Sequence, residues 1–159
     1  MAQKSCDGFI SMSEQMQIEP GLLSDGELSL ELVSFAPHRT HLVPTYHFRI
    51  VHSISGEEMG QINLRSQTNI TIERYAGHIG YGVYEPFRGH RYAARSVSLI
   101  LPLARKLGID PLWITCDPQN TASRRSCEIA GAEFIEIVDL PPDYSGYAFG
   151  QRQKCRYRL

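Results

Sequence analysis

The spacing of apolar residues changes once along the chain, and this change limits the fold more than any other feature of the sequence. In the first half the apolar residues alternate with polar ones, as they do in β-strands. In ELSLELVSFAP, Leu28, Leu30 and Leu32 share one face, and Pro37 stops the run. From about residue 90 to residue 107 the apolar residues follow helical spacing instead. Strands that give way to helices indicate a mixed α/β fold.

The other segments of the first half also fit strands. TYHFRIVHSIS places Tyr46, Phe48 and Ile50 on one face, and GEEMGQINLRS follows it after the turn dipeptide Ser55-Gly56. These two runs are predicted to form an antiparallel hairpin. GHIGYGVY is predicted to be the next strand.

The second half alternates helices with strands. The first helix contains Pro102, which predicts a kink or an early fray, and Gly108 is suited to end it. LWITC is predicted to be a short strand, and Asn120 is a good N-cap for a second helix that runs to about Ala130. EFIEIVDL and KCRYRL are predicted to be the last two strands. The strand–helix–strand core is predicted to form a right-handed parallel unit.

Length and charge describe one ordinary domain. The chain has 159 residues and a formal net charge of −1. A nucleic acid is therefore not expected as its main partner, because duplex binding needs a strong cationic excess. Residues 1–20 are polar and are predicted to be a tail or extension, which leaves 21–159 as the domain. No apolar run is long enough to form a signal peptide or to span a bilayer, so no membrane is expected as a partner.

The cysteines and histidines do not form a metal-binding pattern. Four cysteines are present, with no CxxC pair and no zinc-type spacing: Cys6, Cys116, Cys127 and Cys155. Free thiols in a reducing compartment are the simplest interpretation, and we expect a cytoplasmic protein. His38 and His41 lie three residues apart but lack a third ligand, so no metal is expected there.

The segment YEPFRGHRYA, residues 84–93, joins a predicted strand to a helix N-terminus. The N–H groups at a helix start have no partner within the helix, and the helix dipole is positive there, so such a turn readily binds phosphate. Gly89 and Ala93 let a ligand approach the backbone closely, and Arg88 and Arg91 add charges suited to phosphate oxygens. Ordinary strand–turn–helix junctions share this pattern, so the segment alone does not decide the function.

Two segments together resemble the GNAT superfamily of N-acetyltransferases. GHIGYGVYEPFRGHRYAARS resembles the acetyl-CoA segment of that family, with Arg88 at the first position of its loop and Ala93 at the last. Further along, DPQNTASRRSCEIAGA is similar to the second motif of the family, whose places are filled by Asn120, Ser123, Glu128 and Gly131. The two motifs occur in the family's order and at its separation, and the resemblance covers roughly residues 27–159.

The resemblance implies a fold, an activity and a set of binding residues. The fold is a mixed, mostly antiparallel twisted sheet flanked by helices. The activity is transfer of the acetyl group of acetyl-CoA, a cosubstrate, to a primary amine by direct attack in a ternary complex. The pantetheine arm would lie in a gap between two splayed strands. The cofactor residues implied are Tyr81, Gly82 and Val83 on the strand, Arg88, Gly89, His90, Arg91, Tyr92 and Ala93 in the loop, and Asn120 and Ser123 on the second helix.

The sequence departs from the family pattern in three places. Arg91 stands where the family prefers Gly, and either the backbone there has positive φ and Arg is strained, or Arg91 adds a phosphate contact. Cys127 stands where many members carry a Tyr that protonates the leaving thiolate. Only the residues from Ala36 to Thr45 separate the first two strands, whereas the family usually places two helices there that shape the acceptor pocket.

Two residues are hypothesised to be catalytic. Cys127 shares a helical face with Asn120 and Ser123, and its thiol is proposed to protonate the departing CoA thiolate, although a small buried residue is the alternative. His78 shares a strand face with Gly80 and Gly82, and it is proposed to help deprotonate the amine. The alternative for His78 is a hydrogen bond across the sheet.

Several alternatives stay open at this point. The chain could bind acyl-CoA without catalysis, or use the basic residues of its C-terminal strand as an interaction edge. Those residues, which alternate on one face, are favoured to pair with Glu133, Glu136 and Asp139 instead: Arg152, Lys154, Arg156 and Arg158. Tyr144 and Tyr147 are candidates for an acceptor mouth or an ordinary loop. The acceptor, a small molecule or a protein, is not identified, and a homodimer is neither predicted nor excluded.

Overall fold

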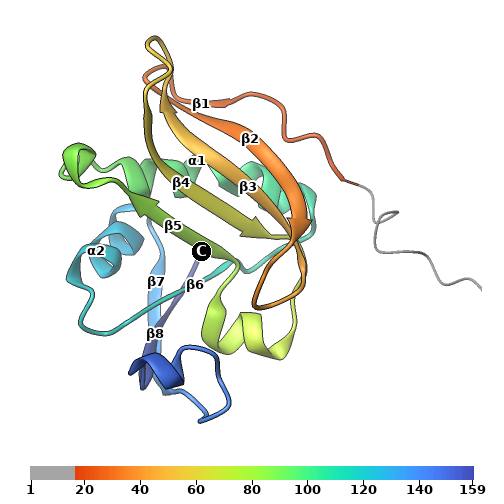
Figure 1. Cartoon of the computed structure of the whole chain (residues 1–159), viewed down its shortest axis with the longest axis vertical. Helices are drawn as coiled ribbons and strands as arrows, with labels where there is room; N and C mark the ends of the chain where they lie inside the picture. The colour runs from red at the N-terminus through yellow and green to blue at the C-terminus, as the bar shows by residue number, and fades with distance from the viewer. Residues whose placement is uncertain (1–16) are drawn as a thin grey trace, which may run out of the picture.

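The computed structural model describes residues 17–159 and contains two antiparallel sheets (Figure 1). The larger sheet has the order β1-β2-β3-β4-β5, with strands Leu23–Ser24, Leu28–Pro37, Pro44–His52, Glu58–Arg65 and Ile79–Val83. The smaller sheet has the order β6-β8-β7, with strands Trp113–Cys116 for β6, Glu133–Asp139 for β7 and Gln153–Arg158 for β8. The predicted mixed fold with mostly antiparallel strands is confirmed.

Within residues 17–159, two α-helices and three short helices connect the strands. The α-helices are α1, Tyr92–Lys106, and α2, Thr121–Ile129. A short π-helix, η2, covers Ile72–Ala76, where the sequence analysis placed no element. Two 3-10 helices, η3 and η4, cover Glu85–Phe87 and Tyr147–Phe149. The predicted tail falls mainly on residues 1–16, which lie outside the described residues.

The prediction for β2 is correct for two of its three apolar residues. Leu28 and Leu30 are buried, but the side chain of Leu32 is 37% exposed. A β-bulge shifts the register between Leu32 and Ser34, and beyond it the partly buried side chain is that of Phe35. A bulge adds one residue to one strand and so exchanges its two faces, which simple alternation does not reveal.

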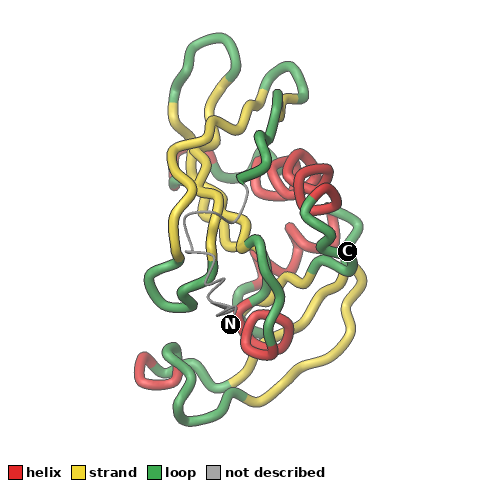
Figure 2. Tube along the Cα trace, turned by 90° about the vertical axis from the view of Figure 1, so that its right-hand side faces the viewer, coloured by secondary structure: helices red, strands yellow, loops and turns green. Residues whose placement is uncertain are grey.

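The hairpin of β3 and β4 is confirmed. The two strands pair antiparallel, and Tyr46, Phe48 and Ile50 are buried on one face as predicted. Helix α1 covers this face of the sheet, as the side view shows (Figure 2). It buries Val97 and Ile100, and it continues through Pro102, which lies on its exposed side.

The predicted parallel unit of β5 and β6 is wrong. The two strands flank α1 in the chain, but β5 is an edge of the larger sheet and β6 is an edge of the smaller one. They are joined beside their first residues, where the His78 N–H donates to the Trp113 carbonyl over 2.7 Å. Beyond this joint, each strand hydrogen-bonds within its own sheet. The resemblance had implied this separation of two strands.

Candidate functional site

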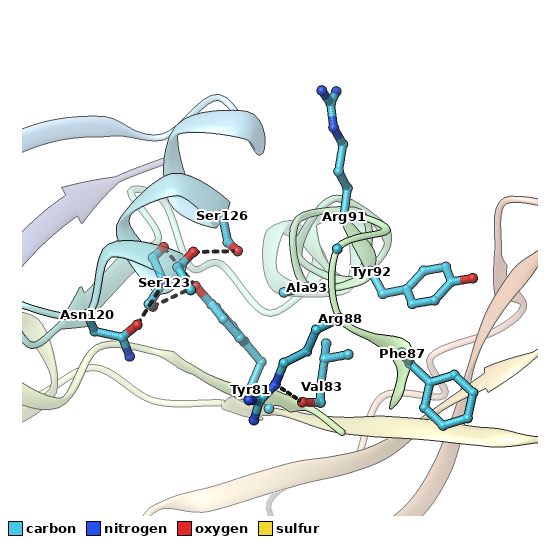
Figure 3. A pocket seen from close by; sticks show the side chains of 13 residues that line it. Tyr81, Val83, Phe87, Arg88, Arg91, Tyr92, Ala93, Asn120, Ser123 and Ser126 are labelled. Atoms are coloured by element: carbon cyan, nitrogen blue, oxygen red, sulfur yellow. Dashed lines mark hydrogen bonds between the residues drawn. The ribbon is translucent and has the colours of Figure 1, made fainter. Parts of the chain in front are cut away.

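A cleft of about 480 Å³ opens between β5, the turn before α1 and the first turns of α2. Figure 3 shows side chains from all three segments around it. The cleft is lined by Tyr81, Gly82, Val83, Phe87, Arg88, Gly89, Arg91, Tyr92, Ala93, Asn120, Ala122, Ser123 and Ser126. Residues some forty positions apart in the chain therefore meet at one site.

Every cofactor residue predicted from the sequence lines this cleft except His90, whose ring stacks on that of Tyr92 at 5.4 Å. The sequence analysis missed Phe87, Ala122 and Ser126. Ser126 could have been found, because it follows Ser123 by three residues and such residues are neighbours on a helix surface. Phe87 belongs to the loop already singled out, but an aromatic residue there carries no phosphate-binding signal.

The N-terminus of α1 faces the cleft without a side-chain cap. Its N-cap residue, Arg91, makes no side-chain capping hydrogen bond, and no acidic residue lies in the first turn. In α2, by contrast, the side-chain Oδ1 of Asn120 accepts a hydrogen bond from the Ser123 N–H at 3.0 Å. Free N–H groups and the positive end of the helix dipole make the start of α1 suitable for an anion.

The turn before α1 contains two residues with left-handed backbones. Gly89 has φ +88° and Arg91 has φ +62°. Glycine adopts this region freely, whereas for other residues it costs about 1–2 kcal/mol. Of the two alternatives for Arg91, the positive φ is the one found. Figure 3 shows the Arg91 side chain extending away from Tyr81 and Arg88.

Arg88 lines the cleft beside the end of β5. Its Nε atom donates to the Val83 carbonyl oxygen at 3.0 Å, so the guanidinium is held beside the edge of β5 (Figure 3). This bond uses one of the five N–H groups of an arginine, which leaves its other donors for a ligand.

Tyr81 links β5 to the first turns of α2. Its hydroxyl lies 2.9 Å from Ser123 Oγ and 3.8 Å from Cys127 Sγ, and it donates to the Ser123 carbonyl at 3.2 Å (Figure 3). Cys127 is completely buried and does not line the cleft. A hydrogen bond with Cys116 and burial together raise the pKa of the Cys127 thiol. Burial likewise raises the pKa of Tyr81.

His78 is also completely buried and lies outside the cleft. Its Nδ1 accepts from the Trp113 N–H at 2.9 Å, and its Nε2 lies 2.8 Å from Thr68 Oγ1. Because Nδ1 accepts, Nε2 carries the proton of the neutral ring and donates to the threonine. Burial lowers the pKa of His78 to about 4. Its role in deprotonating the amine stays a prediction, and so does the acid role of Cys127.

The strand face beside His78 is less bare than its glycines imply. A side chain added at Gly80 would meet the Asn63 side chain at 3.1 Å, whereas nothing lies within 4 Å at Gly82. Asn63 therefore covers part of the surface on which the sequence analysis placed a ligand.

A second pocket, of about 320 Å³, lies between the β2–β3 loop, η2 and the loop after β7. Tyr144 lines it, and so do His41 and Tyr75, whereas Tyr147 does not. The ring of Tyr144 packs against His41 at 6.1 Å and against Tyr75 at 5.8 Å. His38 stacks on His41 at 4.9 Å, so these two histidines belong to an aromatic wall.

The basic residues of β8 are part of the sheet. β8 lies between β6 and β7 and is no edge. Arg156 pairs with Glu136 and Arg158 with Glu133, as the favoured alternative predicted. Asp139 accepts instead from Gln153. The interaction-edge alternative therefore lacks the free strand that it needs.

Residues 17–159 contain neither a membrane-spanning helix nor a cluster of metal ligands. No helix there is long and apolar enough to cross a membrane. No group of three or more His, Cys, Asp or Glu side chains there is arranged to hold a metal ion.

Known structures resemble the chain in fold. A ribosomal-protein-S5-alanine acetyltransferase from Vibrio fischeri aligns with a TM-score of 0.64 at 12% identity, over 87% of this chain and 95% of its own. An acetyltransferase from Agrobacterium tumefaciens aligns with a TM-score of 0.54 at 22% identity, over 72% of this chain and 60% of its own. A microcin C7 self-immunity acetyltransferase, solved with acetyl-CoA and AMP, aligns with a TM-score of 0.54 at 16% identity, over 72% of this chain and 60% of its own.

The sequence comparison identifies the family. Among curated proteins, none matches the chain. The family model described as the acetyltransferase (GNAT) domain matches residues 9–133, which is most of the chain. The match includes β5, the turn before α1, and α2, which together form the cleft. The chain therefore belongs to the GNAT family of acetyltransferases.

Proposed function

We propose that the protein is an acetyl-CoA-dependent N-acetyltransferase that acetylates a primary amine within a ternary complex. One observation carries the proposal: the free edge of β5, the uncapped start of α1 and the small residues at the start of α2 form a single cleft. A strand edge suits the amides of a pantetheine arm, and a helix N-terminus with Arg88 beside it suits a pyrophosphate.

The cleft also has the groups that direct transfer needs. β5 pairs with β4 on one side only, so alternate N–H and C=O groups of its other edge are available to the cofactor. Such N–H groups can polarise a thioester carbonyl while the cleft holds both reactants in position. We further propose that Cys127 supplies its proton through the Tyr81 hydroxyl, which lies between the buried thiol and the cleft.

The place of action is part of the same proposal. The three cysteines of the described residues, Cys116, Cys127 and Cys155, are free thiols. Free thiols support a reducing compartment, and we propose the cytoplasm.

Calorimetry with acetyl-CoA tests the cofactor site. A charge-assisted contact to phosphate contributes about 1.5–3 kcal/mol. Arg88→Ala should therefore weaken acetyl-CoA binding about tenfold or more. Arg125→Ala is the matched control, because Arg125 lies on α2 with its side chain exposed and does not line the cleft. Equal affinity in Arg88→Ala and the wild type would refute this assignment.

Transfer is tested separately from binding. A panel of primary amines with acetyl-CoA should give free CoA in excess of slow hydrolysis for at least one class of acceptor. Tight binding of acetyl-CoA with no transfer to any amine would favour the alternative of a non-catalytic acyl-CoA-binding module.

A further inference from the structure

The second pocket lies at the opposite end of β5 from the turn that precedes α1. The turn follows Val83, whereas η2, which forms one wall of the pocket, comes just before β5 (Figure 1). The five residues of β5 span roughly 16 Å. On the proposed function, an arm that starts at the turn and follows β5 therefore carries its reactive end toward this pocket.

Two polar atoms near this end of β5 lack partners. Within residues 17–159, the buried side-chain atoms without a hydrogen bond are Asn63 Oδ1 and Arg65 Nε. Both residues are on β4, two positions apart, so they share a strand face. Asn63 pairs in register with Gly80 of β5, and the Arg65 N–H donates to the carbonyl of His78, the residue before β5. Buried polar atoms are nearly always hydrogen-bonded, so an unpaired acceptor and an unpaired donor on one strand face point to a ligand.

Among residues 17–159, Arg65 is also a buried cation that pairs with no carboxylate. Only 7% of the residue is exposed, and its guanidinium donates to the Gly77 carbonyl and contacts His38 Nε2 at 3.3 Å. No carboxylate in the described part of the chain forms an ion pair with it. Buried charges are ordinarily paired, because an isolated charge is costly to remove from water.

A second cation, Lys154, lies on the same side. Its ammonium forms no hydrogen bond or ion pair with any of residues 17–159. Burial lowers its pKa, and the Cys116 thiol and Asp117 oppose this shift only at longer range. Burial lowers the pKa of His41 to about 4, and Arg65 and Lys154 are both close enough to contribute to this shift. The imidazole that lines the pocket is therefore neutral at neutral pH, and the positive charge in this region comes from Arg65 and Lys154.

The remaining wall suits a small organic molecule. The rings of Tyr75 and Tyr144 supply apolar surface. Asp143 is the acidic residue that lines the pocket, and it can attract an ammonium group as the acceptor enters.

We propose that this pocket and the adjoining face of β4 bind the acceptor, and that the acceptor is a small amine that also carries a carboxylate. The carboxylate binds toward Arg65 and Lys154, and the amino group lies toward Asn63 and the start of β5. The inference rests on the proposed acetyl transfer and narrows its acceptor. It excludes polycations such as polyamines and aminoglycosides.

Matched pairs of amines test the proposal. Each pair differs only in the carboxylate: glycine and methylamine, L-phenylalanine and phenethylamine, L-lysine and 1,5-diaminopentane. Release of free CoA gives kcat/KM for each. We expect the carboxylate-bearing member to be preferred at least tenfold in one or more pairs, as the loss of one charge-assisted contact predicts. An equal or better rate for the partners without a carboxylate, or no release with any carboxylate-bearing member, would overturn the proposal.

Variants connect that preference to the pocket. Lys154→Met should reduce about tenfold the ratio of kcat/KM between each carboxylate-bearing acceptor and its partner without a carboxylate. Lys106→Met, at the exposed end of α1, is the matched control. An unchanged preference in Lys154→Met would remove that residue from the site. Calorimetry with acetyl-CoA distinguishes failure of this inference from failure of the proposed function. If acetyl-CoA binds but carboxylate-bearing acceptors are not preferred, only this inference is refuted. If acetyl-CoA does not bind, the proposed function is refuted.

Discussion

The two ends of β5 offer a ligand different kinds of chemical group. Beyond Val83 the cleft presents backbone N–H groups, a glycine turn and small side chains. Before Ile79 the pocket is lined by side chains, namely aromatic rings and a carboxylate, and two cations without an ion-pair partner among residues 17–159 lie near it. The first set comes from two continuous segments of the chain, whereas the second comes from the β2–β3 loop, β4, η2, the loop after β7, and β8.

This difference has a physical origin. Pyrophosphate and amide groups can be bound by the main chain, so a helix start and a strand edge suffice. An acceptor is distinguished by its own substituents, and only side chains can recognise those. Substitutions in the second pocket, the proposed acceptor end of β5, should therefore change specificity without abolishing activity. Substitutions in the cleft, the proposed cofactor end of β5, should not be tolerated in this way.

The largest expected effect on kcat comes from Tyr81, at the middle of β5. It tests whether side chains as well as the main chain contribute to catalysis in the cleft. Tyr81→Phe removes the hydroxyl that joins Ser123 and Cys127. If the proton reaches the thiolate by this route, kcat should fall about a hundredfold with little change in KM for acetyl-CoA. The kcat of Cys127→Ala should fall by a comparable factor. The kcat of the double variant should fall no further, because the two residues act as one unit.

Tyr84→Phe serves as the control, since the Tyr84 hydroxyl is exposed and bonds Glu58 outside the cleft. Wild-type turnover in both single variants would leave Tyr81 and Cys127 as packing residues. A slow Tyr81→Phe beside a normal Cys127→Ala would leave the hydroxyl acting alone.

The next effect concerns the joint at the acceptor end of β5. The pKa of His78 is lowered to about 4 from an unfolded value near 6.5, so the unfolded chain binds the proton first as pH falls. Stability from the neutral ring is complete above pH 6.5 and is lost as pH falls toward 4, by about 3 kcal/mol. His41, with a similar pKa, loses stability in parallel. His78→Gln should unfold more easily at pH 7. In the pH range between the two pKa values of His78, its free energy of unfolding should also depend less steeply on pH, by up to one bound proton.

Denaturant unfolding at several pH values measures this slope, and a pH profile of kcat/KM is the companion measurement. We expect the hydrogen bonds to Trp113 and Thr68 to make His78 a structural residue, so the profile should keep its shape in His78→Gln. An ascending limb near neutral pH that disappears in this variant would instead support the predicted role in deprotonating the amine.

The smallest effect tests the backbone at the cofactor end. Arg91 has φ +62°, a conformation that glycine adopts without strain. Arg91→Gly should gain about 1 kcal/mol of stability, less the entropy cost of a glycine in the unfolded chain. A rise in Tm of roughly 2–4 °C is the upper expectation. Thermal unfolding checks it, with Arg88→Gly as the control at a residue of negative φ. A lower Tm for Arg91→Gly would mean that the arginine makes stabilising contacts.

Local patterns predicted most of the elements. The periods of β3, β4 and α1 and the cap at Asn120 depend on neighbouring residues, and these predictions hold. Residue spacing predicted neither the bulge in β2 nor the separation of β5 from β6, and only the family resemblance implied the separation. Both depend on pairing between distant strands, which residue spacing does not encode.

The site divides in the same way. The loop from Arg88 to Ala93 is continuous in sequence, so a motif could locate it. The buried state of His78 depends on Thr68 and Trp113, and that of Cys127 on Cys116 and Tyr81, which are brought in by the tertiary fold. The pairing of Asn63 and Arg65 with the start of β5 needed the register of the sheet. Side-chain environments of this kind are decided by contacts across the molecule.

The order of strands in the two sheets also bears on how the chain assembles. In the larger sheet each strand pairs with its neighbour in sequence, so its contacts are local and should form early. In the smaller sheet β8 enters between β6 and β7, which are both synthesised before it. Until Gln153–Arg158 leaves the ribosome, β6 and β7 have no partner in that sheet. In a nascent chain that lacks this segment, we expect the larger sheet to be formed and the cleft to be incomplete. We expect such a chain to depend on chaperones at that stage.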